Sequence, residues 1–344
     1  MSAPSPSMYS PAATRRMAEL GLKPGKANLE VFAETVTTLA RADRNVLVVT
    51  SDSRGSGKLG PFGQALPDQI VEVGIAEQNL VGVAAGLASS GKTVFAVSPA
   101  CFLTARSLEQ IKNDVAYSDN PVKLVGISAG VSYGALGTTH HSLHDFAALR
   151  AINNVEIIAP ADNWETREAV KAVAGRSRPV YLRFGKAALP ELPRGDEPFV
   201  VGRASVLREG RDVAFIATGE TVVHALLAAA DLEAATGVRA RVISMPTIKP
   251  LDRDAILTAA RQCGALITVE EHMVNGGLGE ACAALLLEAG VHRPFRIVGI
   301  PDEYTVTGSQ ADIFRHYGIT MEGLAATVGD LLAGRRTAGA RHHG

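Results

Sequence analysis

Short hydrophobic runs alternate with amphipathic stretches through the first half of the sequence. Leu29, Phe32, Val36 and Leu39 recur at helical spacing and are followed by "VLVVT" at 46–50, which predicts a helix and then a buried strand. The same alternation predicts further strands at 70–74, 92–98, 122–128, 155–160 and 179–184, and further helices at 77–90, 102–117 and 162–175. Hydrophobic strands separated by helices favour a mostly parallel sheet that is covered on both faces.

A stretch rich in Pro and Gly, residues 188–200, carries no periodic apolar face, which is typical of a linker. The alternation then resumes, with strands expected at 212–218, 239–245, 265–270 and 294–300 and helices at 220–236, 252–262 and 277–289. We therefore predict an α/β protein with two domains, residues 24–187 and 201–333. Residues 1–23 are expected to form a loose N-terminal arm, and residues 334–344 a disordered tail.

The charge balance narrows the classes of partner. With 34 Lys and Arg against 35 Asp and Glu, the net charge is −1 and no basic stripe is present, which argues against nucleic acid or an anionic membrane as the main partner. No signal peptide is recognisable, and no apolar run approaches the ~18 residues of a membrane span. Cys101, Cys263 and Cys282 lack the spacing of a zinc site or a disulfide framework. These features predict a cytoplasmic protein whose partners are small molecules and other proteins.

Two places in the first domain hold chemically versatile side chains. Glu77 begins the helix predicted at 77–90, where an acidic residue also interacts favourably with the helix dipole. His140, His141 and His144 lie in one loop, but the Gly and Thr residues before them predict a turn rather than a helical face that converges on a metal. We therefore predict no metal site on this chain.

The wider sequence around Glu77 resembles a known enzyme family. The string "VGIAEQNLVGVAAGLASSGKTVFAVSPACFLTARSLEQIKND" is similar to the pyrimidine-binding domain of the transketolase family of thiamine diphosphate enzymes. Farther on, "IKPLD" at 248–252 and "TVEEHMVNGGLGE" at 268–280 are typical of the transketolase C-terminal domain. The resemblance extends from about residue 24 to 330 and implies both domains, with thiamine diphosphate and Mg²⁺ as cofactors.

The resemblance assigns residues to the cofactor. Glu77 matches the glutamate that hydrogen-bonds a ring nitrogen of the aminopyrimidine and promotes its imino tautomer. Such a carboxyl must hold or share a proton near neutral pH, which requires apolar surroundings, and the neighbours Ile75 and Leu80 are compatible with this. Phe102, otherwise a candidate core aromatic, matches a residue that packs on the pyrimidine ring. Asp52 matches an acidic residue near the cofactor.

Further residues are assigned to the substrate by the same resemblance. The string "GTTHHSLHD" aligns with a transketolase loop in which His140 matches the histidine that stabilises the developing oxyanion. Arg183 matches the arginine that grips the distal phosphate of the sugar, for which a planar charged fork is suited. Ser56 aligns with a phosphate-contacting serine, and Arg54 is a further candidate anion contact. Asp145 is expected to cap the helix that follows the loop.

The sequence also departs from the family pattern at four positions. Pro99 and Ala105 stand where many relatives carry further aromatic residues around the cofactor. Leu136 and Ser128 stand where familiar transketolases carry an aspartate and a histidine near the sugar. A binding site recognises the hydroxyl groups of a sugar by hydrogen-bonding to them. The loss of both polar groups therefore predicts an unusual ketose as substrate.

One motif of these enzymes is missing. Thiamine diphosphate enzymes hold the diphosphate through Mg²⁺ with a GDG sequence and a later asparagine, and no GDG occurs in these 344 residues. The resemblance therefore implies the C-terminal subunit of a split transketolase, which moves a two-carbon ketol unit from an anionic ketose to an aldose. An N-terminal subunit carrying GDG would complete an α2β2 assembly and hold the metal and diphosphate.

Two other functions remain open at this point. The chain could be the β subunit of a 2-oxoacid dehydrogenase E1 component, which shares the two domains, the glutamate and the missing GDG. It could also be a non-catalytic scaffold subunit, because fold does not decide function. Gly276, Gly277 and Gly279 precede a predicted helix and could cradle a phosphate, but a structural role is the favoured interpretation.

Overall fold

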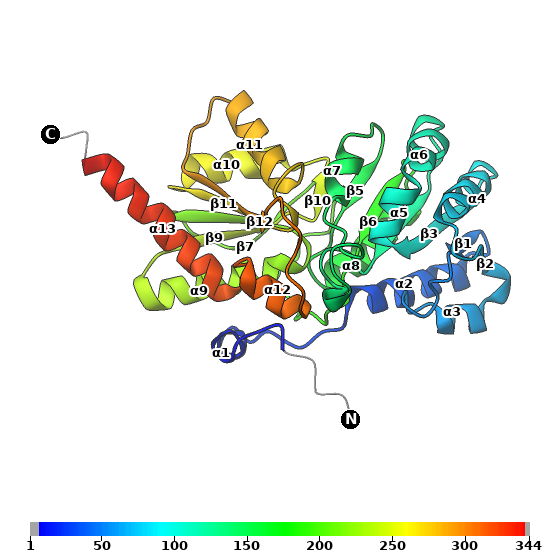
Figure 1. The fold of residues 1–344 in the computed structure, drawn as a ribbon, viewed down its shortest axis with the longest axis horizontal. Coiled ribbons are helices and arrows are strands. Elements are labelled where there is room, and N and C mark those ends of the chain that lie inside the picture. Colours follow the sequence, from blue (N-terminus) through cyan, green and yellow to red (C-terminus); the bar gives the residue numbers. More distant parts are fainter. Residues whose placement is uncertain (1–6, 341–344) are drawn as a thin grey trace.

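The computed structural model describes residues 7–340 and contains two sheets side by side (Figure 1). The first sheet has seven strands in the order β10-β5-β6-β4-β3-β1-β2, and all of its pairings are parallel except that of β10. Its strands are β1 (Val46–Thr50), β2 (Ile70–Glu72), β3 (Thr93–Pro99), β4 (Lys123–Ile127), β5 (Glu156–Ile158), β6 (Val180–Arg183) and β10 (Thr247–Lys249). The predicted mostly parallel sheet is confirmed.

Helices cover both faces of this sheet, which explains its nearly continuous hydrophobic strands. They are α2 (Asn28–Ala42), α3 (Gly60–Ala65), α4 (Glu77–Ser89), α5 (Ala100–Arg106), α6 (Leu108–Gln110), α7 (Asp145–Arg150) and α8 (Asn163–Ala174), and a π-helical segment spans Ile111–Tyr117. Successive strand residues face opposite cores: Val48 packs with Phe32 of α2, whereas Val49 packs with Leu80 of α4. The helix predicted at 102–117 is thus present, but it is divided at Ser107.

The second sheet has the order β12-β11-β8-β9-β7, in which only β7 is antiparallel to its neighbour. Its strands are β7 (Ser205–Arg208), β8 (Val213–Ala217), β9 (Ala240–Ser244), β11 (Leu266–Met273) and β12 (Phe295–Ile300). The helices of this part are α9 (Val222–Thr236), α10 (Arg253–Gln262), α11 (Leu278–Glu288), α12 (Gln310–His316) and α13 (Met321–Ala340). The four strands and three helices expected here are confirmed, whereas β7 was not anticipated.

Strand β10 leaves the second half of the sequence to join the first sheet. It pairs antiparallel with β5, with Thr247 opposite Ile158. Lys249, at its end, donates a hydrogen bond from Nζ to the backbone oxygen of Ile152. A three-residue strand is too short to show a period, so sequence patterning did not predict this link between the two sheets.

The expectation of a loose N-terminal arm is corrected by the structure. Residues 11–19 form helix α1 (Pro11–Glu19), capped by the Ser10 side chain and begun by a proline, which is a favoured start for a helix. Ala13 is buried in the core beside α9, and Arg16 donates a 2.8 Å hydrogen bond to Asp231 of that helix. Helix α1 of the arm is therefore docked on the second domain, as the dark blue segment in Figure 1 shows, whereas residues 1–6 lie outside the described residues.

The expected disordered tail is also corrected in part. Helix α13 extends to Ala340, so residues 334–340 are helical, and residues 341–344 lie outside the described residues. Over the described part of the chain, none of the helices combines the length and the apolar character needed to traverse a bilayer. Cys101, Cys263 and Cys282 are buried free thiols.

Candidate active site

The candidate residues cluster where parallel strands end. Loops that follow the carboxyl ends of neighbouring parallel strands gather at one edge of a sheet, which is the usual binding edge of such folds. Asp52, Arg54 and Ser56 follow β1, Glu77 follows β2, Phe102 follows β3, His140 follows β4, and Arg183 is the last residue of β6. Strand pairing places β2, β1, β3 and β4 side by side in that order.

Glu77 is the first residue of α4, and only 3% of it is exposed. Nη1 of Arg106, at the end of α5, donates a 2.8 Å hydrogen bond to Oε2 of Glu77. The guanidinium of Arg106 also lies over the ring of Phe102, 4.5 Å from its centroid. The carboxylate therefore faces a cation. Of the two apolar neighbours in the sequence, Leu80 is buried, whereas Ile75 is 73% exposed and does not enclose the carboxylate.

His140 lies next to Phe102. The two ring centroids are 5.3 Å apart in an edge-to-face arrangement, and Tyr133 contacts the same imidazole at 5.4 Å. Nδ1 of His140 is 3.0 Å from the Thr139 hydroxyl. Glu77, Arg106, Phe102 and His140 thus form one continuous chain of contacts built from the segments that follow β2, β3 and β4.

The other two histidines of the loop turn away from His140. His141 is buried between the hydroxyl of Thr305, 2.8 Å from Nδ1, and the backbone oxygen of Gly134, 2.9 Å from Nε2, and burial lowers its pKa. Nε2 of His144 is 3.2 Å from the Thr104 hydroxyl. Within residues 7–340, no three His, Cys, Asp or Glu side chains converge as metal ligands.

The loop after β1 is held by contacts of its own. Glu72 accepts a 2.6 Å hydrogen bond from the backbone N–H of Asp52 and lies 3.5 Å from Nε of Arg54. Ser56 donates a 3.2 Å hydrogen bond to the backbone oxygen of Ser53. The structure therefore places these three candidates at the same edge of the sheet as the Glu77–His140 group, but outside its chain of contacts.

Arg183 does not have the geometry of a phosphate-binding side chain. Its side chain is 5% exposed, and Nε donates a 2.8 Å hydrogen bond to Asp145. Nη2 donates to the backbone oxygens of Ser142 and Glu271, at 3.2 and 2.7 Å. Because these donors are engaged inside the protein, Arg183 acts as a structural link between β6, the His140 loop and β11.

Asp145 belongs to the same buried network and does more than start a helix. Its Oδ2 accepts hydrogen bonds from Tyr181 and Arg183, both at 2.8 Å, and its Oδ1 accepts one from the N–H of Phe146. Burial by itself raises the pKa of Asp145, but the adjacent Arg183 outweighs it and holds the pKa below its ordinary value. The expected capping role is wrong, because His144 holds the N-cap position of α7 and no side chain caps this helix; Asp145 is occupied by the ion pair instead.

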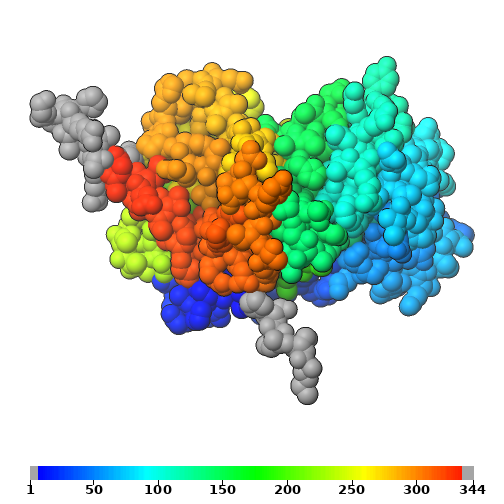
Figure 2. Space-filling model, in the orientation of Figure 1, coloured from blue at the N-terminus to red at the C-terminus, as the bar shows by residue number. Residues whose placement is uncertain are grey.

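The second domain holds up the loop that carries His140. Oε1 of Glu271 accepts hydrogen bonds from the N–H of Val131 and from Nε2 of Gln310, both at 2.9 Å. The same nitrogen of Gln310 lies 2.9 Å from Oε2 of Glu220. Figure 2 shows the orange C-terminal segment packed against the green part of the first domain. Thr305 of the C-terminal segment lies 2.8 Å from Nδ1 of His141 in the loop. Glu220 and Glu271, the two carboxylates that share Gln310, were not predicted from the sequence, because they lie far apart in the chain and belong to no local motif.

Ser128 and Leu136, which stand where the sequence resemblance implies polar residues, have different surroundings. Ser128 is fully buried and has a φ of +53°, a conformation that non-glycine residues rarely adopt. Leu136 is 56% exposed on the same loop. Leu136 therefore presents an apolar surface to any molecule that approaches the loop.

The glycine-rich segment before α11 already has a carboxylate at its helix N-terminus. Oε2 and Oε1 of Glu270 accept hydrogen bonds from the N–H groups of Leu278 and Gly279, at 2.7 and 2.8 Å. A Cβ atom on Gly277 would lie 1.9 Å from Glu270 Oε2, which explains the glycine there. The place of a phosphate is thus filled by the protein itself, in agreement with the structural interpretation.

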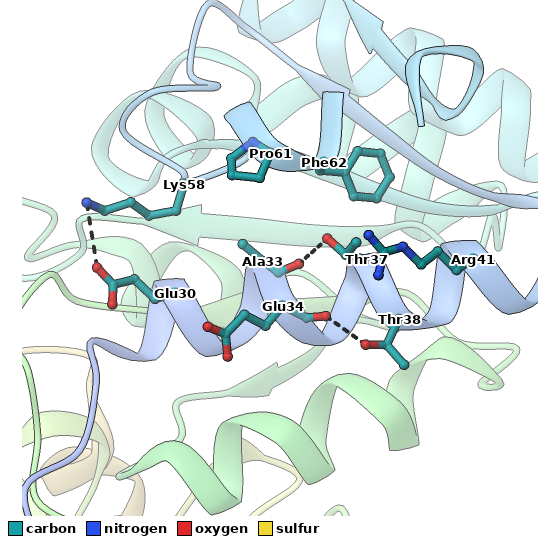
Figure 3. A pocket seen from close by; sticks show the side chains of 9 residues that line it. All are labelled: Glu30, Ala33, Glu34, Thr37, Thr38, Arg41, Lys58, Pro61 and Phe62. Atoms are coloured by element: carbon teal, nitrogen blue, oxygen red, sulfur yellow. Dashed lines mark hydrogen bonds and ion pairs between the residues drawn. The ribbon is translucent and has the colours of Figure 1, made fainter. Parts of the chain in front are cut away.

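A separate groove lies on the outer flank of the first domain (Figure 3). It measures about 460 Å³ and is bordered by α2 on one side and by Lys58, Pro61 and Phe62 on the other. Thr37 and Thr38 bond back to carbonyl groups of their own helix, and Lys58 pairs with Glu30. The two threonines, Glu30 and Lys58 are therefore already paired within the protein, and the candidate catalytic residues lie at the strand ends instead.

Glu220 offers a direct test of the buried carboxylate pair. Burial first, and then the charge of Glu271, raise the pKa of Glu220 to about 8, so the folded protein binds a proton that the unfolded chain releases near its ordinary value of 4.5. The free energy of unfolding should therefore fall as pH rises from about 4.5 to about 8.

Glu220→Gln removes this loss of stability and should raise the melting temperature at pH 8.5 by at least ~2 °C. At pH 5 the variant and the wild type should have the same melting temperature. Exposed Glu288→Gln is the control, and a constant offset between Glu220→Gln and wild type across this pH range would contradict the shifted pKa.

Comparison with known proteins agrees with this arrangement. Residues 25–191 match the model of the transketolase pyrimidine-binding domain, and residues 202–324 match that of the transketolase C-terminal domain. The chain is 51% identical over 298 residues to one of the subunits of an apulose-4-phosphate transketolase of Phocaeicola vulgatus, covering 86% of this chain and 95% of the relative. It is 34% identical to a 6-deoxy-6-sulfo-D-fructose transketolase subunit of a Clostridium species, covering 85% of this chain and 90% of that one.

A solved structure described as a split-gene transketolase in an inactive β4 tetramer superimposes with a TM-score of 0.80. It is 37% identical in sequence, and the match covers 90% of this chain and 99% of that one. The likeness therefore extends over both sheets and almost the full length of these relatives. On sequence and structure together, the chain belongs to the transketolase family, of which it carries the pyrimidine-binding and C-terminal domains.

Proposed function

We propose that this chain is the C-terminal subunit of a two-subunit, thiamine-diphosphate-dependent transketolase. It would transfer a two-carbon ketol unit from a phosphorylated ketose to an aldose. The observation that carries the proposal is the 51% identity to a separate transketolase subunit along 95% of that protein, in a chain that contains no GDG sequence. An N-terminal subunit with the GDG motif would hold Mg²⁺ and the diphosphate in an α2β2 complex.

The residues at the strand ends fit the aminopyrimidine of thiamine diphosphate. Between Glu77 and Phe102 the structure already accommodates a flat, hydrogen-bond-donating group, the guanidinium of Arg106, which bonds the carboxylate and lies over the ring. A planar ring with donor nitrogens suits the same pair of residues. When bound, the cofactor supplies a nucleophilic thiazolium carbon, and the role of Glu77 is to hold a proton at the pyrimidine ring nitrogen. Asp52, on the next loop, is a further candidate contact.

On the substrate side we assign His140 as the donor to the reacting oxygen, because it adjoins Phe102 and stands on a loop anchored by two domains. Buried Arg183 cannot reach a substrate phosphate, so this role passes to Arg54 and Ser56 after β1. Lys186 is an additional candidate, since its ammonium lies 4.8 Å from the ring of Tyr133, which packs on His140. With Leu136 in place of a hydroxyl-reading aspartate, apulose 4-phosphate is the first donor to test.

We continue to predict a cytoplasmic location from the free cysteines. A transketolase subunit differs from a 2-oxoacid dehydrogenase E1 subunit in the substrate of the enzyme, and from a scaffold subunit in supporting catalysis. Assays of the reconstituted pair with apulose 4-phosphate, fructose 6-phosphate and pyruvate separate the three. Ketol transfer from a sugar supports the proposal, turnover of pyruvate supports the dehydrogenase, and thiamine diphosphate binding with no turnover supports the scaffold.

The purified chain alone should neither turn over a ketose nor retain thiamine diphosphate and Mg²⁺ in equilibrium dialysis, because the diphosphate site lies on the partner. Mixing with the GDG-containing subunit should restore both properties. Analytical ultracentrifugation should then show two copies of each subunit. Activity of the chain by itself, or full activity from a single heterodimer, would contradict the assignment.

Replacing His140 with alanine should lower kcat of the assembled enzyme about 10²–10³-fold, the effect of removing one oxyanion donor worth about 2.7–4 kcal/mol. The dissociation constant of thiamine diphosphate should change little, because the proposed partner of His140 is the substrate. Exposed His292→Ala is the matched control and should behave as wild type. Normal turnover in His140→Ala would remove His140 from the site.

Glu77→Gln tests the proton-holding role directly. The amide keeps the shape of the side chain but cannot relay a proton, so hydrogen–deuterium exchange at the thiazolium carbon of the bound cofactor should slow sharply. If Glu77 served only the helix dipole, exchange would be normal and the variant would lose just ~0.3–1 kcal/mol of stability. Exchange is measured by proton NMR after acid quench, and the melting temperature of the same complex reports folding.

A further inference from the structure

Arg106 holds an unusual position in the proposed cofactor site. It is the last residue of α5, and its side chain is 51% exposed, yet its guanidinium reaches Oε2 of the nearly buried Glu77 at 2.8 Å. The same guanidinium lies over the Phe102 ring, 4.5 Å from the ring centroid. One flat cation therefore engages both residues that the proposed function assigns to the pyrimidine ring.

A guanidinium and an aminopyrimidine present similar features to these two residues. Each is planar and delocalised, each donates N–H hydrogen bonds to a carboxylate, and each stacks on an aromatic face. Glu77 and Phe102 thus offer one set of contacts for which the two groups compete. A ring that lies on Phe102 and bonds Glu77 must take the space that the guanidinium fills.

We propose that Arg106 occupies the pyrimidine-binding site, the space between Glu77 and Phe102, in the unassembled subunit, and that its side chain moves out when thiamine diphosphate binds. The inference rests on the proposed function, because it takes Glu77 and Phe102 as cofactor contacts. Half of the Arg106 side chain already lies in solvent, so its departure exposes little further apolar surface. Arg106 thereby sets the affinity of the site for thiamine diphosphate, because only those protein molecules in which the guanidinium has left the pyrimidine-binding site can bind the cofactor.

The arrangement also protects Glu77 before assembly. A buried carboxylate without a partner is strongly unfavourable, and Arg106 supplies both a charge and a hydrogen bond to it. In the complete enzyme the pyrimidine ring replaces that partner. The carboxylate of Glu77 therefore has a partner both before and after assembly. The isolated chain stays folded although it is catalytically inactive.

The opposite possibility is that Arg106 remains on Oε2 and leaves Oε1 to the ring nitrogen. In that case Arg106 would assist cofactor binding rather than compete with it. The two cases predict opposite signs for the same substitution: removing the guanidinium tightens binding if Arg106 competes and weakens binding if it assists.

The first experiment uses the pyrimidine half of the cofactor and the full isolated chain. The probe is 4-amino-5-hydroxymethyl-2-methylpyrimidine, and binding is measured by saturation-transfer NMR titration of wild type, Arg106→Leu and Arg106→Lys. We expect Arg106→Leu to bind the probe about tenfold more tightly than wild type, the factor expected for removing one charge-assisted hydrogen bond. Arg106→Lys keeps the charge without the flat fork and should fall between them. Arg167→Leu, at an exposed position on α8, is the matched control and should bind as wild type does.

The location of binding is checked by adding Phe102→Ala to Arg106→Leu, which should abolish the gain. Melting temperatures confirm that each variant is folded. Equal binding by wild type and Arg106→Leu, or weaker binding by Arg106→Leu, overturns the inference while leaving the cofactor site in place. Binding by neither protein overturns the inference together with the assignment of Glu77 and Phe102.

The second experiment uses the assembled enzyme. Equilibrium dialysis of thiamine diphosphate with Mg²⁺ should give a dissociation constant about tenfold lower for the complex made with Arg106→Leu. An unchanged or higher constant, in a complex that still turns over substrate, overturns the inference but not the proposed function. A complex made with the wild-type chain that fails to bind thiamine diphosphate would instead reject the proposed function itself.

Discussion

The buried ion pair between Arg183 and Asp145 is the contact on which the rest of the site depends. Arg183 ends a central strand of the first sheet, and its donors reach the start of α7, the His140 loop and β11 of the second sheet. Removing one member of such a pair leaves an uncompensated charge in the interior, which costs far more than the pair contributes. The two domains are therefore fixed to each other by the same side chain that shapes the loop.

The contact between the two domains also constrains the backbone around the carboxylates of Glu271 and Glu220. A Cβ atom at Gly130 would lie 2.1 Å from the carboxyl carbon of Glu271, and one at Gly185 would lie 1.9 Å from Oε1 of Glu220. Gly130 also has a φ of +62°, which favours glycine on its own account. The close approach of backbone to carboxylate is thus what brings the second domain within hydrogen-bonding distance of Val131.

A consequence is that the second domain contributes to the geometry of the site even though the proposed catalytic side chains come from the first. The loop with His140 is bonded to Glu271 and Thr305, and Met273 donates from its N–H to the backbone of Leu143. Strand β10 adds a further connection by joining the first sheet. A site built this way is held in place by contacts within this chain.

The sequence by itself determined the alternation of strands and helices, the parallel sheet, and the identity of Glu77, Phe102 and His140 as a candidate group. These follow from local periodicity and from motifs that are contiguous in the chain. Only the tertiary structure decided that Arg183 is buried rather than free to bind a phosphate, and that Arg106 meets Glu77. It also decided that Glu220 and Glu271 share Gln310, and that the N-terminal arm is a docked helix. Each of these depends on which distant segments come into contact, and on the burial that results, neither of which leaves a trace in the spacing of residues along the chain.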